Sequence, residues 1–192
     1  NAQRKLDDMG LGRYIVCHPW AAGFRKEMRE WPEAHWRALT ERLVAEGYRV
    51  VFTGGPSDRE ASSKLLSGLE GTGTTILDMA GQLSLSETAA LISGAAGVVS
   101  VNTGVMHLAA ALDVPLVALH GPTNPSRWGP LSERAVVLIP DADNVAYLNL
   151  GFEYPDDVAP CMQLLTVDEV SEALRGALTS APEPTHSVEI AV

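Results

Sequence analysis

Apolar residues along this chain follow two alternating patterns. Short continuous apolar runs, typical of strands buried on both faces, predict strands over 14–18, 49–53, 74–77, 97–101, 116–119 and 135–139. Between them, helical spacing predicts helices over 32–46, from 57 or 58 to 69, from 84 or 86 to 95, from 104 to 112, and from 166 onward. Strands that alternate with helices form a parallel sheet covered on both faces. We therefore expect an α/β, Rossmann-like doubly wound fold with about six strands.

The predicted helix that starts at Gly104 has a distinctive first turn. Its apolar residues recur at i, i+3, i+4 and i+7, and this stripe should be buried. The predicted stripe comprises Val105, Leu108, Ala109 and Leu112. His107 lies about 160° from the centre of the stripe, at roughly 100° per residue, and so points away from the core. A histidine there could donate a hydrogen bond to an anion, or it could only bond a neighbouring loop.

Two strands that we expect to be neighbours end in small polar residues. One is followed by Asn102-Thr103-Gly104 and the other by Gly121-Pro122-Thr123. In an open α/β sheet, ligands bind at the carboxyl ends of the strands, and a helix N-terminus there favours an anion such as a phosphate. Gly104 would let a ligand approach the backbone. The plainer alternative is an ordinary helix cap and an ordinary turn.

Two further segments carry candidate anion-binding or ribose-binding groups. The loop over 19–31 mixes basic and aromatic residues after the first strand, and Arg127 and Trp128 follow the fifth. Such residues are usually solvated. Their position after strand ends nevertheless favours binding of a phosphate by the basic residues and of a sugar or a base by Trp128. Asp58, after the second strand, could bind a ribose or only cap its helix. The Gly-x-Gly-x-x-Gly fingerprint is absent after the first strand, which argues against a standard NAD site.

Composition excludes several function classes. With 192 residues and 46% hydrophobic residues, the chain can bury a core and is not a disordered chain. Its net charge of −10 argues against nucleic-acid binding, and no apolar run approaches the roughly 20 residues of a membrane span. The two cysteines, Cys17 and Cys161, lie far apart and predict neither a disulfide framework nor a metal site. A reducing cytoplasm fits this cysteine usage.

The remaining histidines and serines suggest no separate catalytic centre. Ser100 lacks the Gly-x-Ser-x-Gly elbow of the α/β hydrolases. Four histidines show no metal-pairing spacing, and we interpret them as structural or solvated. They are His18, His35, His120 and His186.

Taken together, these segments resemble one known family. The motifs that carry the resemblance are His18-Pro19, Trp31-Pro32, Thr53-Gly54-Gly55-Pro56, Ala80-Gly81 with Leu85, residues 103–111, Gly121-Pro122-Thr123, Cys161-Met162 and residues 167–170. The stretch around His107 combined with the Gly-Pro-Thr turn is the most specific part. On these residues, most of the chain is similar to the C-terminal half of the GT-B enzymes of glycosyltransferase family 9, the heptosyltransferase family of lipopolysaccharide assembly.

The resemblance implies a domain that binds a nucleotide-diphosphate sugar without a metal or another cofactor. It implies a diphosphate held by Thr103, Gly104 and His107, a basic residue facing the phosphates and an acidic residue on the ribose. The implied donor-binding residues are Arg29, Asp58, Asn102, Thr103, Gly104, His107, Gly121, Pro122 and Thr123. Many heptosyltransferases have an aspartate in place of Asn102, contacting the sugar. This departure leaves the identity of the sugar open.

The resemblance also bears on domain organisation. It implies that residues 1–180 form the donor-binding domain, and we expect residues 181–192 to be a flexible tail. The family's general base lies in an N-terminal acceptor domain that this chain is expected to lack, so no catalytic residue is assigned. Transfer to a lipopolysaccharide-type, other glycan or lipid-linked acceptor would involve that domain. The full-length protein is expected in the cytoplasm or peripherally at the inner membrane.

Two other functions are compatible with the same strand ends. One is a sugar-nucleotide epimerase-like domain, which would need its own catalytic carboxylates in a longer chain. The other is a non-catalytic nucleotide-binding module, for which Asn102 gives some support. Nucleotide binding and sugar transfer by the full-length protein would separate these possibilities.

Overall fold

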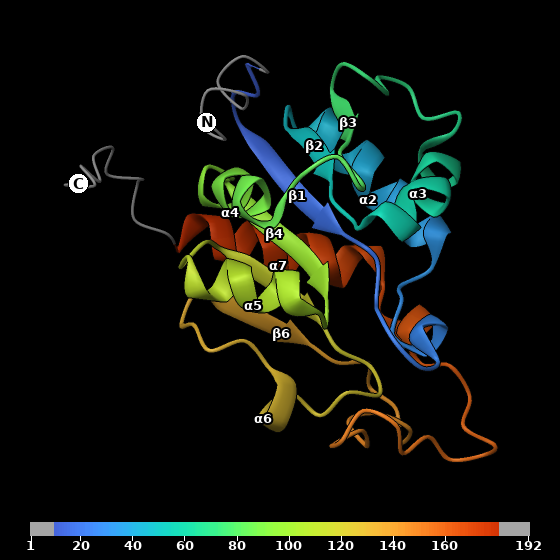
Figure 1. Ribbon diagram of the computed structural model, residues 1–192. Helices are drawn as coiled ribbons and strands as arrows, with labels where there is room; N and C mark the ends of the chain where they lie inside the picture. Colours follow the sequence, from blue (N-terminus) through green and yellow to red (C-terminus); the bar gives the residue numbers. More distant parts are fainter. Residues whose placement is uncertain (1–9, 181–192) are drawn as a thin grey trace.

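The core of the molecule is a six-stranded parallel sheet (Figure 1). The computed structural model describes residues 10–180. Across the sheet the strands are β3 (Ile76–Asp78), β2 (Arg49–Phe52), β1 (Tyr14–His18), β4 (Gly97–Val101), β5 (Leu116–Leu119) and β6 (Ala135–Leu138). The strand order changes direction between β1 and β4, which is the topological switch point of a Rossmann-like fold. The predicted fold class is therefore confirmed.

Helices cover both faces of the sheet and bury two separate apolar layers. The helices are α2 (Glu33–Ala45), α3 (Arg59–Leu66), α4 (Leu85–Ser93), α5 (Gly104–Ala111), the short α6 (Pro125–Trp128) and α7 (Val167–Thr179). One core layer joins the sheet to α2, α3 and α7, and the other joins it to α4 and α5 (Figure 1). Along β1, Ile15 and Cys17 face the first layer and Val16 faces the second. This alternation is why the strands read as continuous apolar runs.

Local sequence explains where most helices begin. Ser84 caps α4 in a capping box with Glu87, and Thr166 caps α7 in the same way with Glu169. Pro32 is the N-cap of α2, with ψ 140°, and not its first helical residue as predicted. α3 follows a 3-10 turn over Pro56–Asp58 and ends at Leu66, earlier than expected, because the chain turns at a glycine with positive φ (Gly68, φ +79°).

The buried face of α5 differs from the predicted stripe. Met106, Ala109 and Ala110 are the buried residues, whereas Leu112 is 37% exposed. α5 ends at Ala111, so Leu112 is the C-cap and lies outside the helix. Two other stripe members are only partly buried against the second core layer; these are Val105 and Leu108. The helix is thus rotated toward Met106, which packs among residues of α4, β4 and β5.

The long segment after β6 returns to the carboxyl edge of the sheet. Leu148 pairs with Thr123 in an isolated bridge, and its backbone N–H donates to Pro122 O at 2.7 Å. Further along, Tyr154 packs edge-on against Phe24 of the loop after β1, with ring centroids 5.9 Å apart. Figure 1 shows this orange segment beside the blue loop after β1. Two connections that are distant in sequence therefore meet at one edge.

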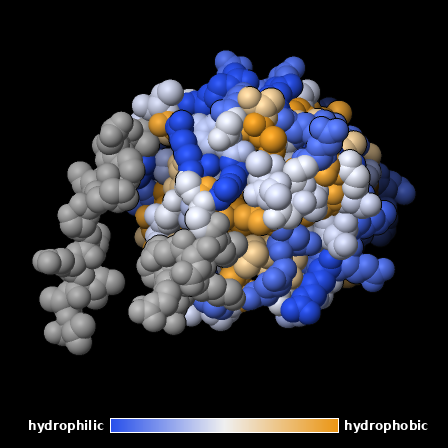
Figure 2. Space-filling view, turned by 90° about the horizontal axis from the view of Figure 1, so that it is seen from above, coloured by the Kyte–Doolittle hydropathy of each residue, from blue (hydrophilic) through white to orange (hydrophobic). Residues whose placement is uncertain are grey.

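The surface of the domain mixes apolar and hydrophilic residues. On the face seen in Figure 2, apolar residues form small groups between hydrophilic ones. Among residues 10–180, no helix has the length and apolar character needed to cross a membrane. The predicted tail at 181–192 and His186 lie outside the described residues.

Candidate functional site

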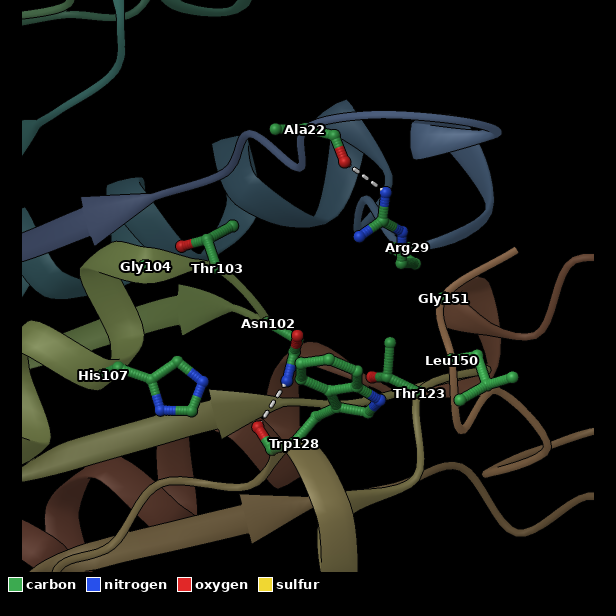
Figure 3. A pocket seen from close by; sticks show the side chains of 10 residues that line it. All are labelled: Ala22, Arg29, Asn102, Thr103, Gly104, His107, Thr123, Trp128, Leu150 and Gly151. Carbon is green, nitrogen blue, oxygen red and sulfur yellow. Dashed lines mark hydrogen bonds between the residues drawn. The ribbon is translucent and has the colours of Figure 1, made fainter. Parts of the chain in front are cut away.

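A pocket of about 310 Å³ lies at the carboxyl edge of the sheet, beside the switch point (Figure 3). The strand ends are level there, because His18 of β1 is in register with Ser100, and Val101 of β4 with Leu119. The pocket is formed by the loops that follow β1, β4 and β5 and by the segment after β6. Its lining residues are Ala22, Arg29, Asn102, Thr103, Gly104, His107, Thr123, Trp128, Leu150 and Gly151.

The N-terminus of α5 forms one side of this pocket. Thr103 is the N-cap residue, but its side chain makes no capping bond, and its Oγ1 is buried without a hydrogen-bond partner. A Cβ on Gly104 would meet nothing within 4 Å, so the backbone there is open to a ligand. His107 is exposed in the first turn, as its position off the core face predicted. The first backbone N–H groups of a helix have no intrahelical acceptor and carry partial positive charge.

Arg29 faces the pocket from the opposite side (Figure 3). Its guanidinium donates to Ala22 O and, at 3.5 Å, to Phe24 O. Its Nε is buried without a hydrogen-bond partner. Both acceptors are neutral carbonyls, and no ion pair of Arg29 with a carboxylate occurs within residues 10–180. Its full positive charge is therefore available to an anion in the pocket.

Asn102 is held by two groups at the floor of the pocket. Its Nδ2 donates to Trp128 O at 2.7 Å and lies 3.3 Å from Nε2 of His120. The same Nδ2 lies 3.5 Å from Nδ1 of His120, and because an amide N–H can only donate, the ring must offer it an unprotonated nitrogen. Nδ1 also lies 3.0 Å from Thr123 Oγ1, which joins Thr123 to the same cluster. With Nδ2 fixed in this way, the Asn102 Oδ1 is the atom presented to the pocket (Figure 3).

His120 is a functional candidate that the sequence interpretation missed. The sequence interpretation of structural or solvated holds in its structural part, because His120 is fully buried, but the interpretation gave no hint that it contacts two residues of the pocket. Burial, and to a smaller extent the nearby His107, lower its pKa to about 4, although a hydrogen bond with the Thr123 backbone partly opposes them. A neutral ring at physiological pH has one unprotonated nitrogen that can accept from Asn102 Nδ2. Its position at the end of an apolar strand was the only sequence signal that could have found it.

Three predicted site residues lie outside this pocket. Asp58, in the 3-10 turn after β2, accepts a hydrogen bond from Gly55 N at 2.8 Å and lies near His18 of β1. Gly121 and Pro122 accept through their carbonyls from Ala146 N and Leu148 N. In these contacts Asp58 closes a turn, and the Gly121-Pro122 backbone anchors the segment after β6. Asp58 makes no side-chain capping bond to α3, and the donor-binding roles predicted for these three residues stay predictions.

The structure adds three lining residues that the sequence did not single out. These are Ala22, Leu150 and Gly151.

Cys17 and Cys161 are both free thiols, and burial raises both of their pKa values. Over residues 10–180, the structure groups no three His, Cys, Asp or Glu side chains in a way that could hold a metal ion.

Comparison with known proteins gives the family. The model of glycosyltransferase family 9 (heptosyltransferase) matches residues 1–148. Lipopolysaccharide heptosyltransferase 2 of Salmonella typhimurium is 39% identical over 111 residues, which are 57% of this chain and 32% of that protein. Lipopolysaccharide heptosyltransferase 1 of Pseudomonas aeruginosa is 38% identical over 136 residues, which are 70% of this chain and 33% of that protein.

Solved structures show the same relationship in three dimensions. The structure of E. coli ADP-heptose lps heptosyltransferase II matches with a TM-score of 0.76 at 28% identity, covering 93% of this chain and 51% of that one. The E. coli heptosyltransferase WaaC with ADP matches with a TM-score of 0.68 at 27% identity, covering 92% and 48%. This chain spans about half the length of these structures and about a third of the curated relatives above. On the family match over residues 1–148, the chain belongs to glycosyltransferase family 9, the heptosyltransferases.

Proposed function

We propose that this domain binds a nucleotide-diphosphate sugar and forms the donor half of a glycosyltransferase. The observation that carries the proposal is the pocket between the α5 N-terminus and Arg29, where Thr103 Oγ1 and Arg29 Nε lack partners. One related structure, the E. coli heptosyltransferase WaaC, contains ADP, and another contains ADP-2-deoxy-2-fluoro heptose. ADP is therefore the first nucleotide to test.

The diphosphate would lie between the α5 N-terminus and the guanidinium of Arg29. The helix offers backbone N–H donors and the Thr103 hydroxyl, and His107 offers a ring nitrogen from the exposed first turn. During sugar transfer, negative charge develops on the departing diphosphate. Donors already fixed in place stabilise that charge more than they stabilise the bound donor, and so accelerate the reaction. No residue described here has to coordinate a metal for this role.

The sugar would lie toward Asn102 and Trp128, and the nucleoside toward β1 and β2. Asn102 Oδ1 can accept from a sugar hydroxyl, because its amide nitrogen is occupied by Trp128 O and His120. Asp58, in the 3-10 turn that follows β2, stays the predicted ribose contact. The acceptor and the general base would be bound by the other half of a two-domain enzyme, for transfer to a lipopolysaccharide-type, other glycan or lipid-linked acceptor. Family membership favours this function over an epimerase-like domain.

The proposal can be tested by calorimetry with ADP, UDP and GDP on the chain as given. At least one of them should bind, and Arg29→Ala should weaken binding about tenfold or more, as expected for losing a charge-assisted hydrogen bond to phosphate. His107→Ala should weaken it less, because the side chain is exposed. Arg175→Ala on α7 removes the same charge away from the pocket and is the matched control.

Two results would count against the proposal. A folded chain that binds none of the three nucleotides would reject nucleotide binding. Equal losses for Arg29→Ala and Arg175→Ala would reject the assigned phosphate contact and leave only a general charge effect. Sugar transfer by the full-length protein would separate an enzyme from a non-catalytic nucleotide-binding module.

A further inference from the structure

A turn over residues 149–153 forms one wall of the pocket, at a distance from α5. It places Leu150 and Gly151 on the pocket (Figure 3). The turn follows the last residue matched by the family model, which ends at residue 148. Neither the sequence motifs nor the family match assigns it a role.

The carboxylate of Glu153 holds this turn closed. Its Oε1 accepts from Asn149 N at 2.6 Å and from Leu150 N at 2.5 Å, and its Oε2 accepts from Phe152 N at 3.0 Å. Gly151 has φ +95°, a conformation that residues with a side chain rarely adopt. The backbone path of the turn therefore depends on one carboxylate and one glycine.

The turn is also tied to both neighbouring walls of the pocket. On one side, Asn149 O accepts from Trp128 Nε1 at 3.0 Å, and Asn149 Oδ1 accepts from Asn124 Nδ2 at 2.9 Å. On the other side, the guanidinium of Arg25 lies 5.0 Å from the ring centroid of Tyr154, directly after Glu153. The segment thus links the loop after β5 to the loop after β1, and Leu150 lies between these two attachments.

The chemistry of the pocket changes from one end to the other. The end between the α5 N-terminus and Arg29 offers hydrogen-bond donors and positive charge, whereas the end at Trp128 offers an indole and the side chain of Leu150, which is 56% exposed. A sugar ring has apolar C–H faces that pack on an indole or an aliphatic side chain, while its hydroxyls need acceptors such as Asn102 Oδ1. A nucleotide sugar with its diphosphate at α5 would bring its sugar to this apolar end.

We propose that Leu150 is a specificity-determining contact for the sugar of the donor, and that Glu153 is the positioning residue that presents it. The inference rests on the proposed function, because it assumes that the diphosphate lies at the N-terminus of α5. It concerns only the sugar half of the ligand. A nucleoside diphosphate without a sugar should therefore be insensitive to this turn.

Calorimetry with ADP and ADP-heptose tests the contact directly. Leu150→Ala should weaken ADP-heptose about fivefold, the loss expected when a leucine contact of this size is removed, and should leave ADP within about twofold. Phe152→Ala is the matched control, because Phe152 lies in the same turn, is 66% exposed and does not line the pocket. That variant should leave both affinities unchanged. If UDP or GDP proves to be the nucleotide bound, UDP-glucose or GDP-mannose replaces ADP-heptose in the same comparison.

Glu153→Gln tests the positioning role. The amide of glutamine keeps only one acceptor oxygen, so either Phe152 N or the pair Asn149 N and Leu150 N loses its partner and should exchange faster with deuterium. The same variant should also show a smaller preference for ADP-heptose over ADP. A purely structural role would lower the melting temperature and leave that preference unchanged.

The two proposals fail on different results. A folded wild-type chain that binds neither the nucleoside diphosphates nor the nucleotide sugars refutes the proposed function. A chain that binds both ligands, with the same preference in the wild type, Leu150→Ala and Glu153→Gln, refutes only the role of the turn.

Discussion

Acid should destabilise this domain through two buried histidines, His18 and His120. Burial lowers the pKa of each from 6.5 to about 4, although Asp58 partly opposes the effect at His18. A histidine whose pKa is lower in the folded state binds fewer protons folded than unfolded. Its contribution to stability is therefore complete above pH 6.5 and is lost as the pH falls toward 4.

The magnitude follows from the two pKa values. At pH 4.5 the unfolded histidine is almost fully protonated, while the folded one is mostly neutral. One pKa unit is worth about 1.36 kcal/mol, so each histidine should lower the free energy of unfolding by roughly 2 kcal/mol between pH 7 and pH 4.5. The two together would remove roughly 4 kcal/mol, a large part of the 5–15 kcal/mol typical of a domain.

Urea unfolding, followed by tryptophan fluorescence at pH 7 and pH 4.5, measures these losses. His120→Gln and His18→Gln should each reduce the acid-induced loss by roughly 2 kcal/mol, and the double variant should reduce it by the sum. Carboxylates with lowered pKa values, such as those of Glu153 and Glu169, also favour unfolding in acid, but they are common to all variants and cancel in the comparison. The same acid-induced loss in all four proteins would refute the reasoning.

Three further substitutions have defined expected outcomes. Asn102→Asp should lower the unfolding free energy at pH 7 by about 1–2 kcal/mol in urea titrations, because a carboxylate oxygen would replace the donor to Trp128 O. Gly121→Ala should cost about 1–3 kcal/mol, measured in the same way, because its Cβ would lie 2.5 Å from Sδ of Met162 and 3.0 Å from Sγ of Cys161. Ser84→Ala removes the cap of α4 and should cost about 1 kcal/mol. An unchanged urea midpoint for any of these variants would contradict the corresponding contact.

Features set by neighbouring residues in sequence could be predicted well. The six strands lie where continuous apolar runs occur, with ends shifted by at most two residues. The cap at Ser84 needs only a serine and a glutamate three residues later, so it can be found in the sequence itself. The same is true of the helix N-terminus after Asn102-Thr103, since a strand ends and a helix begins there.

The buried face of α5 could not be predicted from periodicity. Within the helix, His107 is the only polar residue, so many rotations of the helix bury a similar apolar area. The choice of Met106 over Leu112 follows from packing against α4 and the sheet and from the end of the helix at Ala111. Residue spacing alone predicts which face of a helix is buried only when polar residues define the opposite face.

The apolar end of the pocket depends on contacts between distant parts of the chain. Leu150 reaches the pocket because, in the segment after β6, Leu148 pairs with Thr123, 25 residues earlier, and Asn149 accepts a hydrogen bond from Trp128, 21 residues earlier. That segment has no regular apolar spacing, so the sequence offered no register for it. The polar half of the pocket, by contrast, lies directly at strand ends that the apolar runs define.

Asn102 shows how such distant contacts change the meaning of a motif residue. The resemblance leads one to expect an aspartate there, and the asparagine leaves the sugar open. In this fold the side chain faces the carbonyl of Trp128 and the acceptor nitrogen of a neutral His120. Both neighbours require a donor, which asparagine supplies and an aspartate would not. Asn102 therefore still presents an oxygen to the pocket, but without a negative charge, so no carboxylate at this position would offset the attraction of Arg29 and of the α5 N-terminus for the diphosphate that we propose.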